Sequence, residues 1–121
     1  MKRNSYQRGQ AAEQLALCYL KQQGLRLIKQ NFHSHQGEID IIMRQDESLV
    51  FVEVRQRSRR DYGSALESIT PKKQHRIIQT AHYYLQRNPQ QQNDLCRFDV
   101  VVIEPRSGEE KIQWIKNAFQ A

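Results

Sequence analysis

Two acidic residues interrupt the apolar strands of one predicted β-hairpin. The segment GEIDIIMRQDESLVFVEVRQRS, residues 37–58, reads as two apolar strands around a short polar turn, with Asp40 in the first strand and Glu53 in the second. If the turn centres on Asp46 and Glu47, Asp40 lies directly opposite Glu53. Facing carboxylates on a sheet repel each other unless a proton or a cation neutralises them. A divalent cation such as Mg²⁺, which prefers oxygen ligands and keeps several waters, is the simplest remedy.

The same register makes one face of the hairpin wholly apolar. It pairs Ile39 with Val54, Ile41 with Val52 and Met43 with Val50. A slip by one residue would destroy this match, because side chains alternate between the two faces of a strand. The alternative to a metal site is structural: Glu53 pairs with an arginine, and Asp40 accepts hydrogen bonds at a strand end.

A third acid, Glu13, is predicted to point toward the protein from the first helix. At about 100° per residue it falls between Leu17 and Leu20, inside the apolar arc of the helix. An inward glutamate needs a partner, and the hairpin offers either a metal or Arg55. The alternative is a boundary residue whose carboxylate reaches solvent.

The elements that would position these acids follow from hydrophobic periodicity and from turn signals. A helix is predicted over residues 7–23, with Gly24 as its stop, and a second helix has Thr70 as N-cap, Pro71 in its first position and Asn88-Pro89 at its end. Strands are predicted at residues 26–31, 37–44, 49–55, 96–104 and 111–116. The apolar runs IDIIM, LVFVEV and FDVVVI favour strands covered on both faces. The sequence therefore predicts an α/β fold with a sheet between helices, in one domain over residues 1–121.

The charge balance favours a polyanionic partner. The chain has 19 Lys and Arg against 13 Asp and Glu, a formal net charge of +6. Nucleic acid is the leading partner class for such a chain, although anionic membrane surfaces also attract basic proteins. No apolar run approaches the roughly 20 residues that cross a membrane, and the polar start does not resemble a signal peptide. We therefore expect a cytoplasmic protein with no membrane partner.

Basic residues gather next to the predicted acids. The segment RQRSRR follows the second hairpin strand directly, and the second helix carries lysines and arginines at mostly three- or four-residue spacing. These side chains could follow the phosphates of a nucleic acid, whereas the alternative is an ordinary solvated face. The predicted phosphate contacts are Arg57, Arg59, Arg60, Lys72, Lys73 and Arg76.

Five other residues could be mistaken for metal ligands, a base-stacking platform or reactive thiols, and the sequence favours other interpretations. His33 and His35 lie in a loop without a third spaced ligand and are expected to be surface or phosphate-contacting residues. Trp114, in an alternating terminal strand, is predicted to be core rather than a base-stacking platform. Cys18 and Cys96 have no CxxC partner and sit in apolar contexts, which predicts structural, buried thiols.

The pattern as a whole resembles a known nuclease signature. A carboxylate-bearing strand, a turn, and a strand with Glu-x-basic resemble the PD-(D/E)xK motif, here Asp40 and then Glu53-Val54-Arg55. The segments QRGQAAEQLALCYL, NFHSHQGEIDIIM, LVFVEVRQRS, YGSALESITPKKQHRI and TAHYYL together resemble the YraN family, proposed relatives of Holliday junction resolvases. The resemblance covers nearly the whole chain.

The resemblance implies the restriction-endonuclease-like fold, a mixed central β-sheet flanked by helices, and metal-dependent hydrolysis of DNA phosphodiester bonds, with branched DNA as a candidate substrate. Asp40 and Glu53 would hold Mg²⁺ or Mn²⁺, and Glu13, which matches the helical glutamate of the family, would hold a water on that metal. Glu38 would be an extra ligand or the salt-bridge partner of Arg55. Gln74 would contact the scissile strand, and a homodimer is compatible with the analogy to resolvases.

Arg55 departs from the pattern, because the family of nucleases usually carries lysine there. An arginine keeps a positive charge for the phosphate or an attacking water, but it cannot be deprotonated and so cannot act as a base. One alternative function is therefore a catalytically weak or inactive nucleic-acid-binding module of the same fold. Another is a protein-interaction domain whose charge serves solubility.

Overall fold

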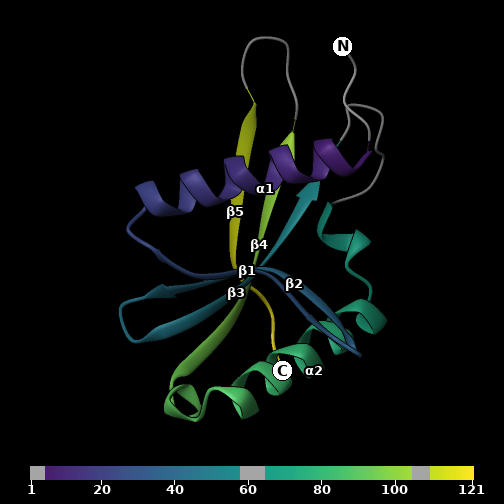
Figure 1. Ribbon diagram of the computed structural model, residues 1–121. Coiled ribbons are helices and arrows are strands. Elements are labelled where there is room, and N and C mark those ends of the chain that lie inside the picture. Colours follow the sequence, from purple (N-terminus) through teal and green to yellow (C-terminus); the bar gives the residue numbers. More distant parts are fainter. Residues whose placement is uncertain (1–4, 58–64, 105–109) are drawn as a thin grey trace.

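A five-stranded sheet lies between two helices in the computed structural model, which describes residues 5–57, 65–104 and 110–121 (Figure 1). The strands lie in the order β1-β2-β3-β4-β5, and only β3 and β4 are parallel neighbours. The mixed sheet flanked by helices confirms the predicted α/β fold and is consistent with a restriction-endonuclease-like fold. The helices are α1 (Ser5–Gln22) and α2 (Pro71–Arg87), with short 3-10 turns η1 (Ala65–Ser68) and η2 (Pro89–Gln91) around α2, and the strands are β1 (Arg26–Ser34), β2 (Gly37–Gln45), β3 (Ser48–Gln56), β4 (Leu95–Glu104) and β5 (Lys111–Phe119).

The predicted helix signals act as expected. The Thr70 side chain accepts a hydrogen bond from Lys73 N at 3.2 Å, Pro71 opens α2, and Asn88 caps its end. Gly24 follows α1 with φ of 98°, a left-handed conformation that glycine adopts without steric cost. The connection from β3 to β4 passes through α2, and a crossover of this length allows the two strands to run parallel.

The two faces of the sheet build separate apolar cores. One core joins α1 to the sheet through Ala16, Leu17 and Leu20, and the other joins α2 to the opposite face through Ile77 and Ala81. The observed hairpin register pairs Ile41 with Val52, Ile42 with Phe51 and Met43 with Val50, which confirms the predicted register along this part of the hairpin.

One predicted pair is wrong. Ile39 packs in the core on the α2 side, whereas Val54, its predicted partner on one apolar face, packs on the α1 side. The β2–β3 pairing begins at Ile41, and on the other side of β2 the β1 residue Asn31 adopts a left-handed φ of 53°. The strand alternation is therefore broken at Asp40, which lies between the two isoleucines.

The cysteines also differ from expectation. Both Cys18 and Cys96 are free and exposed, because Cys18 lies on the outer side of α1 and Cys96 near the exposed start of β4. Trp114 is partly buried against the core on the α1 side, as predicted. Among the described residues, no helix combines the length and apolar character needed to cross a bilayer.

Candidate active site

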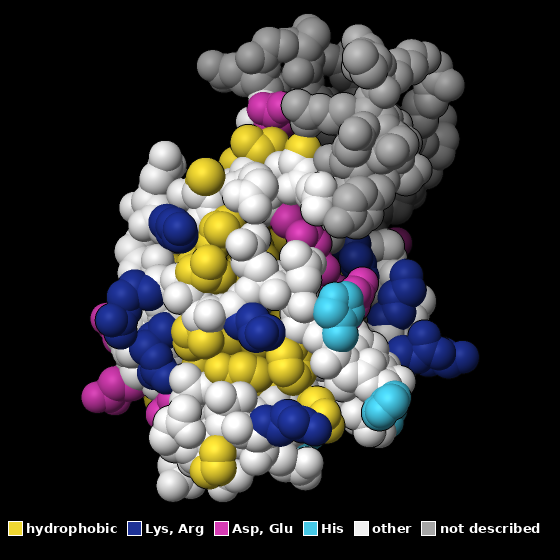
Figure 2. Space-filling model, in the orientation of Figure 1, with side chains coloured by type: hydrophobic (Ala, Val, Ile, Leu, Met, Phe, Trp, Pro, Cys, Tyr) yellow, Lys and Arg dark blue, Asp and Glu magenta, His cyan; other side chains and the backbone are white. Residues whose placement is uncertain are grey.

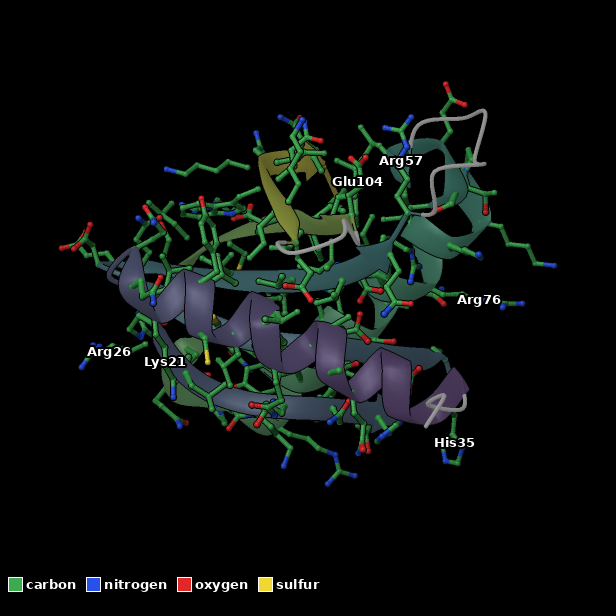
Figure 3. All side chains as sticks on the ribbon, turned by 90° about the horizontal axis from the view of Figure 1, so that it is seen from above. Lys21, Arg26, His35, Arg57, Arg76 and Glu104 are labelled. Atoms are coloured by element: carbon green, nitrogen blue, oxygen red, sulfur yellow. The ribbon has the colours of Figure 1, made fainter. Side chains whose placement is uncertain are left out.

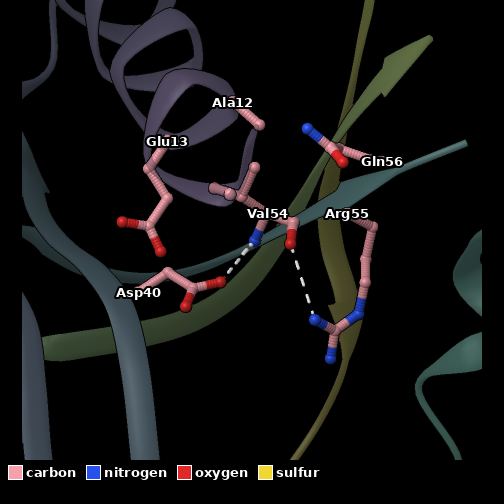
Figure 4. Close-up of a pocket in the computed structure, with 7 residues that line it drawn as sticks. Ala12, Glu13, Asp40, Val54, Arg55 and Gln56 are labelled. Atoms are coloured by element: carbon pink, nitrogen blue, oxygen red, sulfur yellow. Dashed lines mark hydrogen bonds between the residues drawn. The ribbon is translucent and has the colours of Figure 1, made fainter. Parts of the chain in front are cut away.

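Two of the predicted acids, Glu13 and Asp40, line a pocket of about 250 Å³ beneath the first half of α1 (Figure 4). Three of the four predicted catalytic residues line it, namely Glu13 from α1, Asp40 from β2 and Arg55 from β3. The fourth, Glu53, is 5% exposed and is not among the lining residues. The remaining lining residues are Gly9, Ala12, Val54 and Gln56.

Glu13 is held over the hairpin because its neighbour Ala12 and the following turn of α1 are buried against the sheet. Figure 4 shows its carboxylate pointing toward that of Asp40. Burial raises the pKa of Glu13 to about 7, and the charge of Asp40 and a hydrogen bond with it act in the same direction. A hydrogen bond with the Asn31 side chain opposes this rise. Glu13 is partly buried and lines the pocket, so its side chain points toward Asp40, as the inward prediction expects, from a boundary position, as the alternative expects.

Asp40 occupies the point where the β2–β3 ladder stops. Its Oδ2 atom accepts a hydrogen bond from Val54 N at 2.8 Å. The Asp40 side chain therefore pairs with a backbone N–H of β3 at the point where the backbone pairing of β2 with β3 has ended. Burial raises the pKa of Asp40, and the Val54 N–H and the charge of Arg55 oppose that rise.

Glu53 is the most deeply buried of these acids. Burial, followed by the charge of Asp40, raises its pKa to about 8 against the lowering effects of Arg55 and the Asp40 backbone N–H. Its Oε2 atom lies 3.6 Å from Arg55 Nη2, and its Oε1 atom has no hydrogen-bond partner among the described residues. The charges of Asp40 and Glu53 therefore interact, although the β2–β3 pairing begins at Ile41 and does not place the two residues directly opposite each other as the predicted hairpin register does.

These groups fit a divalent cation that keeps several waters. Within the described ranges, no three His, Cys, Asp or Glu side chains are grouped so as to hold a metal by themselves. Mg²⁺ does not need such a cage, because it is commonly bound by one or two carboxylates and water. The buried, unpartnered Oε1 of Glu53 and the raised pKa values of Glu53 and Asp40 are what a nearby cation would relieve.

Both contacts of the structural alternative are also present. Asp40 accepts a backbone hydrogen bond, and Glu53 pairs with Arg55. The ion pair is long, however, since charge-assisted N–H···O bonds usually measure about 2.7–2.9 Å. Glu38, predicted as an extra ligand or as a partner of Arg55, pairs instead with His33 at 3.1 Å, and both side chains are exposed. Its charge still raises the pKa values of the three site acids.

The predicted phosphate contacts lie in several settings. Arg57 follows the end of β3 and is partly buried, while Arg59 and Arg60 lie outside the described residues. Lys72, Lys73 and Arg76 are exposed on α2. Lys73 Nζ donates to Ser68 O at 3.3 Å, and Gln74 Nε2 donates to Ile69 O at 3.0 Å. The Gln74 amide therefore has a local structural partner in addition to its predicted contact with the scissile strand.

The turn between β1 and β2 is fastened to α2 beside Arg76. Gly37 has φ of 154°, and a Cβ there would meet Thr80 Oγ1 at 3.4 Å and Arg76 Cβ at 3.6 Å. Ser34 Oγ donates to Thr80 Oγ1 at 3.4 Å. Figure 3 shows Arg57, Arg76 and His35 at one end of the molecule and Lys21 and Arg26 at the other. The space-filling view in Figure 2 shows Lys and Arg side chains beside Asp, Glu and His side chains on this face, rather than one continuous basic patch.

Sequence reasoning missed one buried acid, Asp99 in β4. Its side chain is fully buried, and it accepts hydrogen bonds from Arg97 Nε, Trp114 Nε1 and Asn117 N. The available signal was the same as for the hairpin acids, a carboxylate that interrupts an apolar run, here FDVVVI.

The chain is similar to proteins of one family along nearly all of its length. The model of the Uncharacterised protein family UPF0102, the YraN family, matches residues 12–103. A UPF0102 protein of Nitrosococcus oceani is 51% identical over 113 residues, which are 93% of this chain and 91% of the relative. A UPF0102 protein of Legionella pneumophila is 49% identical over 95% of this chain and 96% of the relative, and one of Pseudomonas fluorescens is 43% identical over 98% of each. The names of these relatives state the family and no activity, and they confirm the predicted resemblance.

Proposed function

The chain belongs to the UPF0102 (YraN) family, and we propose from the chemistry of its site that it is a metal-dependent endonuclease that hydrolyses DNA phosphodiester bonds. Branched DNA is the substrate class that we expect, and Mg²⁺ or Mn²⁺ the cofactor. The observation that carries this proposal is the meeting of Glu13, Asp40 and Glu53 from three separate elements, with raised pKa values and an unpartnered carboxylate oxygen.

The energetic argument is that a fold does not gain stability from such a cluster. Carboxyl groups whose pKa values are raised by burial and by a neighbouring carboxylate destabilise the folded protein when they ionise, and Asp40 has this effect on Glu13 and Glu53. Clusters of this kind are common where a protein must bind a cation or transfer a proton. The open pocket above Asp40 also gives a substrate access to the acids, which a purely structural ion pair does not require.

Each residue then has a defined part in the reaction. Asp40 and Glu53 would hold the cation, which supplies a more acidic water and stabilises charge on the phosphate when bound. Glu13, whose pKa of about 7 lets it exchange a proton near neutrality, would hold the attacking water from the α1 side. Arg55 would donate to a phosphate oxygen and stabilise the developing charge, because it stays protonated throughout.

The basic residues of α2, together with Arg57, support a nucleic acid as the substrate. Helix α2 contains four Lys and Arg residues and no acidic residue, and its first half lies beside the fastened β1–β2 turn. Arg57 and Arg76 lie at the same end of the molecule (Figure 3). These residues are the cations that we expect to contact the phosphates of a bound strand, and each phosphate contact adds salt-sensitive affinity.

A nucleic-acid-binding module with little or no turnover is the second candidate. It is favoured by the hydrogen bond from Val54 N to Asp40 and by the pairing of Arg55 with Glu53, which give both acids a partner without a cation. Arg55 in place of lysine points the same way, since it removes a group that could act as a base.

The decisive experiment is a cleavage assay on branched, flapped, single-stranded and duplex DNA with Mg²⁺ or Mn²⁺. Wild type should cut at least one substrate, while Asp40→Asn and Glu53→Gln should cut none. Salt-sensitive binding without cleavage by wild type would favour the binding module. The absence of both binding and cleavage would favour a protein-interaction domain.

A further inference from the structure

Arg55 lies between the pocket and the Glu53 carboxylate and is held weakly by both of its contacts. Its side chain lines the pocket and is 28% exposed, and its Nη2 atom lies 3.6 Å from Glu53 Oε2. Its Nη1 atom donates to the carbonyl oxygen of Val54 at 3.5 Å, and Figure 4 shows the guanidinium turned away from Glu13. Both distances exceed the roughly 2.7–2.9 Å of a good charge-assisted hydrogen bond.

The two members of this ion pair leave complementary atoms unused. Arg55 Nε and Glu53 Oε1 are buried, and neither has a hydrogen-bond partner in the part of the chain that the structure describes. A guanidinium and a carboxylate can form two parallel hydrogen bonds, yet this pair makes none of that length. Glu53 thus keeps an acceptor oxygen without a donor, and Arg55 keeps a donor without an acceptor, among the described residues.

We propose that Arg55 changes partner: it pairs with Glu53 in the cation-free protein and turns to a phosphate of the bound nucleic acid when Glu53 takes a divalent cation. The proposal rests on the proposed function, because it assigns the cation to Asp40 and Glu53. The long contact to Glu53 costs little to break, whereas a phosphate offers the planar guanidinium the two-pronged acceptor that suits it. Arg55 lines the pocket, so it already faces the space that a nucleic-acid strand would enter.

This exchange makes the binding of cation and nucleic acid cooperative. A cation that binds Glu53 breaks the ion pair and leaves Arg55 free to bind a phosphate. A phosphate that binds Arg55 breaks the same pair and leaves Glu53 free to bind a cation. By linkage, each ligand raises the affinity for the other by the same factor. The fold would therefore bind its cation most tightly when substrate is present.

The first test measures cation binding without nucleic acid. Mg²⁺ is titrated calorimetrically into wild type, Arg55→Met and the matched control Arg57→Met at pH 8.5, above the pKa of about 8 of Glu53. Arg55→Met should bind Mg²⁺ about tenfold more tightly than wild type, because the competing charge is gone, while Arg57→Met should stay within about twofold. Unchanged or weaker binding by Arg55→Met would overturn the proposal.

The second test measures DNA binding without a cation. Its main comparison uses two glutamate variants, so it remains informative even if Arg55→Met does not fold. A 20-base-pair duplex is bound in EDTA at the same pH by Glu53→Gln and by Glu13→Gln, which each remove one carboxylate from the site. Glu53→Gln should bind about fivefold more tightly than Glu13→Gln, because only Glu53 holds Arg55. Combining Glu53→Gln with Arg55→Met should abolish the excess. Equal affinities of the two single variants would show that Arg55 does not change partner.

The outcomes separate this proposal from the proposed function. If Mg²⁺ binds wild type and Asp40→Asn equally, the assigned cation site is wrong and the exchange falls with it. If Mg²⁺ binding depends on Asp40 while Arg55→Met leaves the affinity unchanged, the nuclease site stands and only the exchange of partners is overturned.

Discussion

Two aspartates of this sheet begin from the same local arrangement and end in opposite states. Asp40 and Asp99 each interrupt an apolar strand at a break in a β-ladder, next to an asparagine with φ near 50°. Each accepts one backbone N–H from the neighbouring strand, from Val54 at 2.8 Å and from Asn117 at 2.9 Å. A broken ladder leaves a backbone donor unpaired, and a short acidic side chain satisfies it in both places.

The difference lies in what surrounds the remaining oxygens. Asp99 receives Arg97 Nε on both oxygens at 3.1 Å and Trp114 Nε1 at 2.9 Å, in a setting closed to solvent. Asp40 faces a pocket and two other carboxylates, and the guanidinium that acts on it is that of Arg55, which is held only by long contacts. We call the Asp99 site saturated, because its carboxylate oxygens have hydrogen-bond partners, and the cluster of Glu13, Asp40 and Glu53 unsaturated, because an oxygen of Glu53 has none among the described residues. The saturated site is a structural element, whereas a ligand that binds at the unsaturated cluster can still gain free energy.

The largest expected effect is on stability at the saturated site. Asp99→Asn should lower the free energy of unfolding by about 3 kcal/mol, since it neutralises the fully buried member of an ion pair and leaves the partly buried Arg97 without its counter-ion. Glu53→Gln in metal-free buffer should cost far less, because it also removes the repulsion by Asp40. Urea denaturation in EDTA measures both. A cost for Glu53→Gln as large as that for Asp99→Asn would make the Glu53–Arg55 pair structural and erase the contrast between the sites.

The next effect is stabilisation by a cation at the unsaturated site. Mg²⁺ at about 100 times its dissociation constant should stabilise wild type by about 2.7 kcal/mol, because it binds only the folded state. Asp40→Asn should lose this gain, and Asp99→Asn should keep it from a lower starting stability. Thermal melts with and without Mg²⁺ report both changes. An undiminished rise in Tm for Asp40→Asn would remove Asp40 from the ligands.

A smaller effect is expected on the pH dependence of metal-free stability. The pKa values of Glu13 and Glu53 rise from 4.5 to about 7 and about 8 on folding, so between these limits the folded state binds more protons than the unfolded state. The stability contributed by these groups is therefore fully present below about pH 4.5 and is lost as pH rises toward 8. Melts in EDTA from pH 5 to 8.5 should show this fall, and Glu53→Gln should flatten it. The exposed Glu38→Gln is the control, and an equal flattening there would assign the effect to general charge.

Much of the fold was predictable because its signals are local. Thr70 and Pro71 at the start of α2 and the alternation of Ile41 and Met43 in β2 each depend on neighbouring residues alone. The displacement of Ile39 was not predictable, because it depends on how Asp40 uses a donor of another strand. Local patterns thus predict elements and register, while they do not predict where a ladder breaks.

The candidate site shows the same limit. The sequence predicted that Glu13, Asp40 and Glu53 lie near one another, because all three interrupt apolar patterns, but strand periodicity did not predict the break in alternation at Asp40. The sequence alone could not show that Glu53-Val54-Arg55 belongs to the candidate site while Arg97-Phe98-Asp99 is structural. Both segments have an acid and an arginine two residues apart on one strand. Only the saturation of the acid, which comes from Trp114 and Asn117 on β5, distinguishes them.

The smallest expected effect concerns the surroundings of the two sites. If the unsaturated cluster acts on nucleic acid, cations near it should contact phosphates, and cations near Asp99 should not. Arg76→Ala should reduce the slope of log affinity for duplex DNA against log salt by about 0.9, the contribution of one neutralised phosphate. Lys116→Ala, which removes a cation lying 4.3 Å above the Trp114 ring beside Asp99, should leave the slope unchanged. Fluorescence anisotropy between about 50 and 200 mM salt covers the range in which this difference is measurable. Equal reductions would mean that the chain attracts DNA by its net charge of +6 alone, and the position of the acid cluster would then carry no information about the bound strand.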